Sequence, residues 1–416
     1  MEKERTLNKE YAIKLLGFLC PLVYFASYLT RKDYSIVMDA IISSEGINAG
    51  SAGLVETLGV ISYGAGQIIS GILGDRFKPR KLIIFGLSVT VLCNLIMPFA
   101  PEGLRFPVWF VNGFAQSMLW PPLVRIMASL MDEKRYNTVA ANVNVAGISG
   151  TIFVYLTASL IWLKLFNNWR YTFFASAAVS GIILLTCLSG FKRISSFIDI
   201  PSKKKEVSED GVSKKAPGLS FKQLMASGFI LIAIGIILQG ALRDGITDWV
   251  PTLLRNTFMI PSEYAILYAV AIPMLGVISM KVVGIAANKW VKEELNGSAV
   301  IFAASAILSF VLLLTYQNNK YLTVILAAVI VGCMHAVNFF LVCVVPAKFE
   351  KYGIVATMSG IINSLTYVGT SLAVAGFPHL IKNGDWGPCI IVWVVVSVIG
   401  ALICLLAVRG WKKFKA

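Results

Sequence analysis

The stretch SYLTRKDYSIVM, residues 27–38, places three charged side chains inside a long apolar run. They are Arg31, Lys32 and Asp33. About half a chain later, the stretch GALRDGITDWVP at residues 240–251 repeats this feature with Arg243, Asp244 and Asp248. A guanidinium at bilayer depth costs about 3 kcal/mol on insertion scales, so a buried arginine indicates a functional site by default. Two arginines in corresponding places of the two halves strengthen that interpretation.

The composition indicates a polytopic membrane protein. Of the 416 residues, 57% are hydrophobic and 14% are charged, and the mean hydropathy is +0.74. A globular interior cannot bury this much apolar surface. Because apolar runs of roughly 20 residues suffice to cross the hydrocarbon core and recur along the whole chain, we expect membrane-spanning helices throughout.

The net charge of +15 would by itself fit a protein that binds nucleic acid. However, most lysines and arginines fall in the termini and in alternate loops on one side of the predicted spans. This asymmetry is the positive-inside pattern, and it places both termini in the cytoplasm. The charge therefore predicts orientation in an inner or plasma membrane and argues against a nucleic-acid partner.

We predict an all-α membrane protein with twelve transmembrane helices in two six-helix halves. The predicted spans are 14–38, 52–73, 82–100, 106–131, 137–163, 171–191, 223–254, 262–286, 298–316, 321–346, 354–380 and 387–408. The longest connection carries KKKEVSEDGVSKK, a polar, lysine-rich stretch that cannot bury a core. We expect an N-terminal half at residues 1–192, a cytoplasmic linker at 193–221 and a C-terminal half at 222–416.

The sequence lacks the patterns typical of enzymes and metalloproteins. All seven cysteines lie in apolar spans, without a CxxC pair or a zinc-type histidine spacing, so we expect packing residues. The chain contains no P-loop and no pattern of a catalytic triad. The charged N-terminus differs from a cleavable signal, so the first span should remain as an anchor. We expect no cofactor and no enzymatic activity.

The two halves resemble each other weakly. The glycine-bearing segment VAGISGT at 145–151 has a counterpart in LTYVGTS at 365–371, and the first span of each half carries the midspan charges. This pattern is typical of a transporter built from two parallel repeats, with the substrate site at the midplane between them.

Helical spacing puts a cation and hydroxyl groups on one face of the first span. The members of this stripe are Tyr24, Tyr28, Arg31 and Ser35. Lys32 points about 100° away from it. In the second half, Gln239 and Arg243 form an i, i+4 pair, and Asp244 and Asp248 lie on an adjacent stripe. Because an arginine fork binds phosphate and carboxylate equally through two parallel hydrogen bonds, the residues predict an anion site and leave the type of anion open.

Several charged residues in the spans have two interpretations. The two arginines are either a substrate clamp or a charge pair inside the bundle, for example with Asp33 or Asp248. Glu56 either faces the outer vestibule or carries a proton, and the second case would make the protein a proton-coupled symporter. His335 is either a hydrogen-bonded bundle residue or a relay. Lys281 either snorkels toward the cytoplasm or supplies a cation to the site.

Polar residues within the remaining spans either line a cavity or tie helices together. These are Tyr63, Asn142, Asn144, Asn338 and Asn363. In the fourth span, Pro121 and Pro122 follow Trp120. Since a proline removes a backbone hydrogen bond and clashes with the preceding turn, we expect a kink there.

The loop after the second span reads GILGDRFKPRK, residues 71–81. Its cations form a positive-inside cluster, and Asp75 can face a helix N-terminus or pair with an arginine such as Arg125. The loop resembles the signature G-x-x-x-D-R-x-x-x-R-[RK] of the major facilitator superfamily. The matching residues are Gly71, Asp75, Arg76, Arg80 and Lys81. This resemblance implies the major facilitator fold and a cytoplasmic gating role for the loop.

Four stretches together resemble the organophosphate:phosphate antiporter family, which includes carriers of glycerol-3-phosphate and hexose phosphates. They are YLTRKDYSIVM at 28–38, GDRFKPRK at 74–81, FAQSMLWPPLVR at 114–125 and LRDGITDWVPTLL at 242–254. The resemblance implies that Arg31 and Arg243 hold the substrate phosphate, and that Lys32 and Asp248 form a charge pair across the halves. Candidates for further substrate contacts are Lys32, Tyr24, Tyr28, Tyr63 and Gln239, and candidates for coupling are Asp244 and Glu56.

Two positions depart from that family, because Ala146 and Gln67 stand where relatives of the glycerol-3-phosphate carrier have histidine and lysine. We expect exchange of an organic phosphate, such as glycerol-3-phosphate or a sugar phosphate, for inorganic phosphate by alternating access, with a monomer working in the lipid bilayer. The first alternative is a proton-coupled symporter for an organic anion such as a sugar acid. The second alternative is a transporter-like sensor that binds the anion without moving it.

Overall fold

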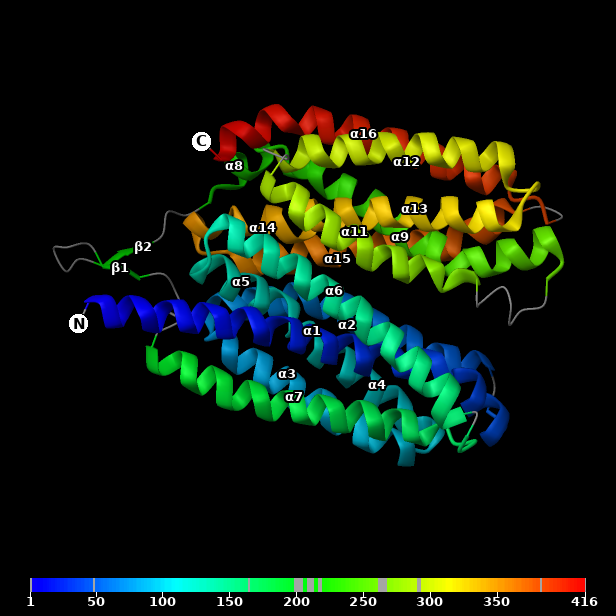
Figure 1. Ribbon diagram of the computed structural model, residues 1–416, viewed down its shortest axis with the longest axis horizontal. Coiled ribbons are helices and arrows are strands. Elements are labelled where there is room, and N and C mark those ends of the chain that lie inside the picture. Colours follow the sequence, from blue (N-terminus) through cyan, green and yellow to red (C-terminus); the bar gives the residue numbers. More distant parts are fainter. Residues whose placement is uncertain are drawn as a thin grey trace. The chain divides into compact units, whose positions relative to one another are not determined.

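The computed structural model describes residues 2–47, 49–163, 165–197, 205–207, 213–215, 219–260, 268–289, 293–381 and 384–415. The chain divides into two compact units (Figure 1). Unit 1 comprises Met1–Ala216 and Phe349–Ile361, and unit 2 comprises Pro217–Lys348 and Ile362–Ala416. The helix α15, Val355–Leu380, therefore begins in unit 1 and continues in unit 2.

Within the described ranges, unit 1 consists of helices and one short ribbon. Its elements are α1 (Glu2–Glu45), α2 (Ala49–Arg76), α3 (Pro79–Ile96), η1 (Met97–Phe99), α4 (Glu102–Ser117), α5 (Trp120–Leu130), α6 (Glu133–Thr157), η2 (Ala158–Leu163), α7 (Arg170–Phe197), β1 (Lys205–Val207), β2 (Ser213–Lys215) and η4 (Glu350–Tyr352). Within this unit α1 packs against α6 and α7, α2 against α4, and α3 against α7.

Unit 2 contains helices only, within the part that the structure describes. Its elements are α8 (Phe221–Ala226), α9 (Phe229–Phe258), α11 (Ala271–Lys289), α12 (Glu294–Thr315), α13 (Lys320–Asn338), η3 (Phe339–Val344), α14 (Val345–Ala347), the rest of α15, and α16 (Gly387–Lys415). The helix α12 packs against α13 and α16, and α9 packs against α13 and α16.

The predicted all-helical membrane architecture is confirmed, with one addition. Each of the twelve predicted spans overlaps helical residues, and nine helices among the described residues are long and apolar enough to cross a membrane. The addition is the antiparallel ribbon β1–β2, in which Lys205 pairs with Lys215 inside the stretch predicted as a cytoplasmic linker. Helix α7 also continues to Phe197, beyond its predicted end at 191, because Ile194 extends its buried face.

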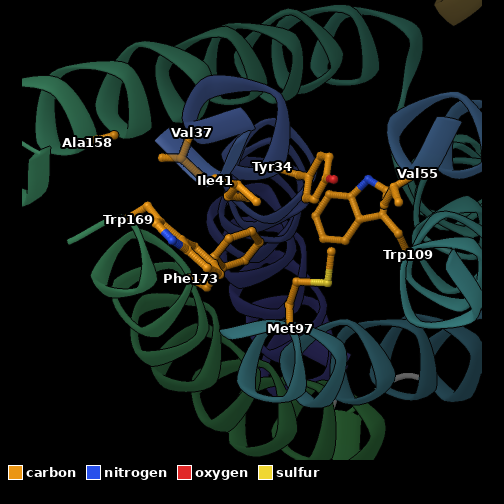
Figure 2. Packing of buried hydrophobic residues seen from close by; sticks show 9 residues of the cluster. All are labelled: Tyr34, Val37, Ile41, Val55, Met97, Trp109, Ala158, Trp169 and Phe173. Atoms are coloured by element: carbon orange, nitrogen blue, oxygen red, sulfur yellow. The ribbon is translucent and has the colours of Figure 1, made fainter. Parts of the chain in front are cut away.

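A hydrophobic cluster of unit 1 includes the α1 residues that directly follow the charged stretch. Nine buried side chains form it, as Figure 2 shows: Tyr34, Val37, Ile41, Val55, Met97, Trp109, Ala158, Trp169 and Phe173. The Tyr34 and Trp109 rings lie 5.3 Å apart between centroids, and Phe173 meets Trp109 edge-on at 6.0 Å. These aromatic contacts hold α1 against α4 and α7, and therefore fix the helix that carries Arg31.

The predicted kink in the fourth span is confirmed. The span divides into α4, which ends at Ser117, and α5, which begins at Trp120. Pro121 and Pro122 occupy the first turn of α5, where a missing backbone N–H costs little. The break places the Trp120 indole against Tyr24 of α1, with ring centroids 4.9 Å apart.

An ion-pair cluster ties three helices together at the end of α1. Glu45 accepts from Arg105 of α4 at 2.5 Å and from Arg170 of α7 at 2.6 Å. Arg105 is 2% exposed and donates from Nε to the Ala100 carbonyl. Both guanidiniums also lie near the Trp169 ring. Removal of the carboxylate would thus leave a buried cation poorly compensated.

We predict that Glu45→Gln destabilises the protein by roughly 2–3 kcal/mol, since it weakens two charge-assisted hydrogen bonds, one of them to a buried partner. Thermal unfolding in detergent would measure this as a clear fall in Tm. Glu10→Gln is the matched control, because Glu10 pairs with Arg135 at 2.8 Å at an exposed site and should matter little. Equal Tm changes for the two variants would contradict the prediction.

Candidate functional site

Arg31 of α1 lies between two tyrosine rings in unit 1. Its guanidinium carbon is 4.2 Å from the ring centroid of Tyr28 and 4.4 Å from that of Tyr63 on α2. Cation–π contacts of this kind attract the guanidinium to the faces of the two rings. The structure thus brings together three of the residues that the sequence analysis named as substrate contacts.

A polar ladder from α4 positions the part of α1 that precedes Arg31. Gln116 donates to the Thr30 hydroxyl at 3.2 Å and accepts from the Ser27 hydroxyl at 3.1 Å. Asn112, one turn earlier on α4, donates to the Thr30 carbonyl at 3.2 Å. Sequence reasoning missed these residues. The available signal was their spacing, since i, i+4 amides on one apolar helix face a common neighbour.

Tyr24 and Tyr28 line α1 against α6. The two rings lie 5.1 Å apart, and a Cβ at Gly147 of α6 would come within 2.9 Å of both. A larger residue at 147 would therefore force the tyrosine rings or the helices to shift. The neighbouring residue, Ala146, is the position at which the resemblance implies a histidine in relatives.

Gln67 lies one turn after Tyr63 on α2 and is completely buried. Neither its amide nitrogen nor its amide oxygen has a hydrogen-bond partner among the described residues. A buried amide without partners is costly and marks either strain or a group that binds something. Gln67 therefore joins the candidate residues of unit 1, at the position where the resemblance implies a lysine.

Two carboxylic acids belong to the helices that carry Arg31 and Tyr63: Asp33 on α1 and Glu56 on α2. Glu56 is half-buried and accepts from Trp109 Nε1 at 3.0 Å. Asp33 is wholly buried, and its Oδ1 accepts from the Tyr34 backbone N–H at 2.9 Å. Its Oδ2 has no hydrogen-bond partner within the described ranges. The sequence indicates Asp33 only as a possible partner of Arg31, and its complete burial could not be read from the pattern.

In unit 2, Arg243 forms a bidentate ion pair with the residue that follows it. Arg243 Nε donates to Asp244 Oδ1 at 2.6 Å, and Nη2 donates to Oδ2 at 2.9 Å. Thr370 of α15 donates to the same Oδ2 at 2.6 Å. The side chains of Arg243 and Asp244, which helical spacing places on adjacent stripes of α9, are therefore in direct contact.

Gln239 lies one helical turn before Arg243 on α9, and its side chain contacts α13. It donates to the Met334 carbonyl at 3.2 Å, and Asn338 donates to its side-chain oxygen at 3.5 Å. His335 lies between these two α13 positions and is half-buried. Immediately after Asn338, α13 widens into the π-helical segment η3. Segments of this kind frequently accompany functional sites.

The remaining predicted residues differ in exposure. Lys32 is half-buried in unit 1, whereas Asp248 and Lys281 of unit 2 are exposed. Because Lys32 and Asp248 belong to different units, their charge pair stays a prediction. The exposure of Lys281 on α11 is consistent with the snorkelling interpretation.

The loop signature at the end of α2 caps the start of α15 inside unit 1. Asp75 accepts from the backbone N–H groups of Ala356 at 2.9 Å and Thr357 at 2.7 Å. Arg125 Nε lies 3.9 Å from the same carboxylate, and Arg125 also donates to the Gly74 carbonyl. Both interpretations of Asp75, a helix N-terminus and an arginine partner, are therefore confirmed together.

The backbones of α2 and α15 approach each other closely beside the Asp75 contact. A Cβ at Gly71 would lie 2.6 Å from the Ala356 carbonyl oxygen, so α2 and α15 meet at van der Waals distance there. Arg76 is exposed and Arg80 is half-buried. Two of the signature residues, Gly71 and Asp75, contact the start of α15.

We predict that Asp75→Asn speeds amide hydrogen exchange at Ala356 and Thr357 by roughly tenfold, since a hydrogen bond to a charged group contributes roughly 1.5–3 kcal/mol. Hydrogen–deuterium exchange with mass spectrometry would resolve the start of α15. Asp132→Asn is the control, because Asp132 caps α6 by accepting from the Arg135 N–H. Unchanged exchange at Ala356 and Thr357 in the Asp75 variant would contradict the assignment.

A sequence profile of the Major Facilitator Superfamily matches residues 22–374. A glycerol-3-phosphate transporter of Bacillus subtilis is 28% identical over 250 residues, 56% of this chain and 55% of that protein, so the chain spans about half the length of this relative. The membrane sensor protein UhpC of Escherichia coli is 22% identical over 401 residues, 92% of this chain and 89% of that protein. A probable hexose phosphate transport protein of Chlamydia pneumoniae is 26% identical over 130 residues, 30% of this chain and 29% of that protein.

Two solved structures share the fold. The transporter FucP in the outward conformation superposes with a TM-score of 0.68 at 13% identity, over 97% of this chain and 99% of that chain. The proton:xylose symporter XylE superposes with a TM-score of 0.68 at 14% identity, over 98% of this chain and 97% of that chain. At such identities the likeness concerns the fold alone.

Proposed function

Because the chain belongs to the Major Facilitator Superfamily, we propose that it is a secondary transporter that exchanges an organic phosphate for inorganic phosphate across a cell membrane. The family membership favours a transporter over an enzyme. Relatives named as carriers of glycerol-3-phosphate and hexose phosphates support a phosphate ester as the substrate. Glycerol-3-phosphate and sugar phosphates are the substrates that we would test first.

The observation that carries this proposal is the pair of half-buried arginines, one in each unit. Arg31 lies between two tyrosine rings in unit 1, and Arg243 lies within a polar cluster in unit 2. Each guanidinium sits in an apolar helix, where a charged side chain is costly and marks a functional site by default. A planar fork that donates parallel hydrogen bonds suits a phosphate group.

The proposed mechanism is alternating access, with the two units moving about a central site. Two guanidiniums that approach each other across the site would repel, and a bound anion would cancel that charge and favour the occluded state. Reorientation would then depend on occupancy, which gives exchange instead of leak. Lys32 and Asp248 would pair across the units, and the Asp75 contact with α15 would open and re-form at the cytoplasmic face.

A second candidate function is an anion sensor. The alignment with the sensor UhpC extends over 92% of this chain, which is more than the alignment with the named transporters covers. A sensor would use the same arginines to bind the anion but would not need to release it on the other side. Binding alone therefore cannot separate the two functions.

The deciding experiment is uptake of labelled phosphate into proteoliposomes that contain the purified protein. An exchanger should require phosphate or a phosphate ester inside the vesicles, whereas a proton symporter should respond to a pH gradient without internal anion. Competition by glycerol-3-phosphate, sugar phosphates and sugar acids would then identify the substrate class. Phosphate binding without uptake would favour the sensor, and competition by sugar acids alone would replace phosphate with carboxylate.

A further inference from the structure

We propose that Asp244 competes with the substrate for the Arg243 guanidinium and thereby lowers the affinity of the transporter for phosphate. This inference rests on the proposed function, because it concerns the same anion site. In this view, substrate binding in unit 2 is an exchange of one anion for another. Asp244 is then an affinity-determining residue, beside the two arginines that hold the substrate.

The geometry of the pair leads to this inference. The Asp244 carboxylate uses Nε and Nη2 of Arg243, with donor–acceptor distances of 2.6 and 2.9 Å. These two nitrogens form one planar edge of the guanidinium, and phosphate oxygens bind such an edge through the same two parallel bonds. A phosphate that binds this edge must displace the carboxylate.

The pair is also held from outside α9. Consecutive residues on a helix point about 100° apart, so Arg243 and Asp244 do not face each other by helical geometry alone. Thr370 of α15 donates to Asp244 Oδ2 at 2.6 Å and so keeps the carboxylate beside the guanidinium. The Arg243 and Asp244 side chains are 14% and 26% exposed, so neither charge is fully screened by water.

Two roles for Asp244 predict opposite effects of removing its charge. If Asp244 competes with the substrate, Asp244→Asn frees the Arg243 edge, removes a repulsive charge and tightens phosphate binding. If Asp244 merely holds Arg243 in place, the same variant loosens the arginine and weakens binding. Asparagine keeps the size of the side chain and can still accept from Thr370, so the change is confined to charge.

Isothermal titration calorimetry of the full-length protein in detergent, with inorganic phosphate at one fixed pH and ionic strength, tests this inference. We expect Asp244→Asn to lower the Kd about tenfold or more, which equals about 1.4 kcal/mol. Asp244→Ser, a second neutral variant, should act in the same direction, whereas Asp244→Glu should stay within roughly threefold of the wild type. Asp385→Asn is the control for net charge, because it also removes one negative charge. The hydrogen bonds that Asp385 accepts come from Tyr316 and from the Gly387 N–H.

A double-mutant cycle links the effect to the arginine. Asp244→Asn should bring no gain in the Arg243→Gln background, because the edge for which the two anions compete is gone. If the wild type binds phosphate and both neutral variants bind it equally or more weakly, the inference is overturned and the proposed function stays intact. Folded protein that binds phosphate in neither the wild type nor the neutral variants would overturn both. Binding that becomes measurable only in the neutral variants would support the inference.

Discussion

Arg31→Gln and Arg243→Gln should each lower phosphate uptake into proteoliposomes by about a hundredfold or more. Removing the cation from a hydrogen-bonded charge pair that is shielded from water costs roughly 2–5 kcal/mol, and about 2.7 kcal/mol corresponds to a hundredfold. Initial rates of labelled phosphate uptake, normalised to reconstituted protein, would measure the loss.

The control for these two variants is Arg255→Gln, which removes an exposed arginine from the last turn of α9. It should transport at nearly the wild-type rate. Size-exclusion profiles and circular dichroism should show that all three variants remain folded. Uptake at the wild-type rate by either site variant would refute the assignment of that arginine to the anion site.

Gly369→Val should abolish the arrangement of the unit 2 site and destabilise the protein by about 3 kcal/mol, the cost of severe overpacking. A Cβ at Gly369 of α15 would lie 1.9 Å from the Ile237 carbonyl oxygen of α9, and one at Gly240 would lie 2.2 Å from the Thr366 carbonyl oxygen. The two helices therefore touch backbone to backbone. Thr370, which holds Asp244, is adjacent to this contact.

Gly376→Val offers a matched control on the same helix, because a Cβ at Gly376 would meet no atom within 4 Å among the described residues. Thermal unfolding and phosphate calorimetry on both variants would separate the effect of the contact from that of a β-branched residue. Similar Tm values and similar phosphate affinities for the two variants would show that close α9–α15 packing is unimportant for the site.

The major facilitator fold could be predicted from the sequence, and so could the presence of charged side chains inside apolar helices. A charge inside an apolar helix is conspicuous, because so few residue types normally occur there. The same holds for Pro121 and Pro122, whose effect on a helix is local, and for Asp75, whose loop pattern is specific. These features depend on the chemistry of single residues or on short spacings.

Apart from the helix N-terminus and the arginine that meet Asp75, the partners of those residues could not be predicted, since they depend on how helices rotate and approach one another. Helical spacing placed Arg243 and Asp244 on different stripes, yet the Arg243 guanidinium donates to the Asp244 carboxylate. Thr370 of α15 donates to the same carboxylate. The ladder from Gln116 to Thr30 and the burial of Gln67 likewise arise from tertiary packing. Propensity carries no information on such contacts, and spacing indicates only which residues share a helix face.

Counterflow tests the central claim most directly. Proteoliposomes loaded with unlabelled phosphate are diluted into medium with a trace of labelled phosphate, and the internal label is followed over time. We predict that the wild type accumulates label transiently above its equilibrium level, that external glycerol-3-phosphate or a sugar phosphate suppresses this accumulation, and that Arg31→Gln and Arg243→Gln show none. Wild-type protein that binds phosphate but accumulates no label above equilibrium would contradict the account.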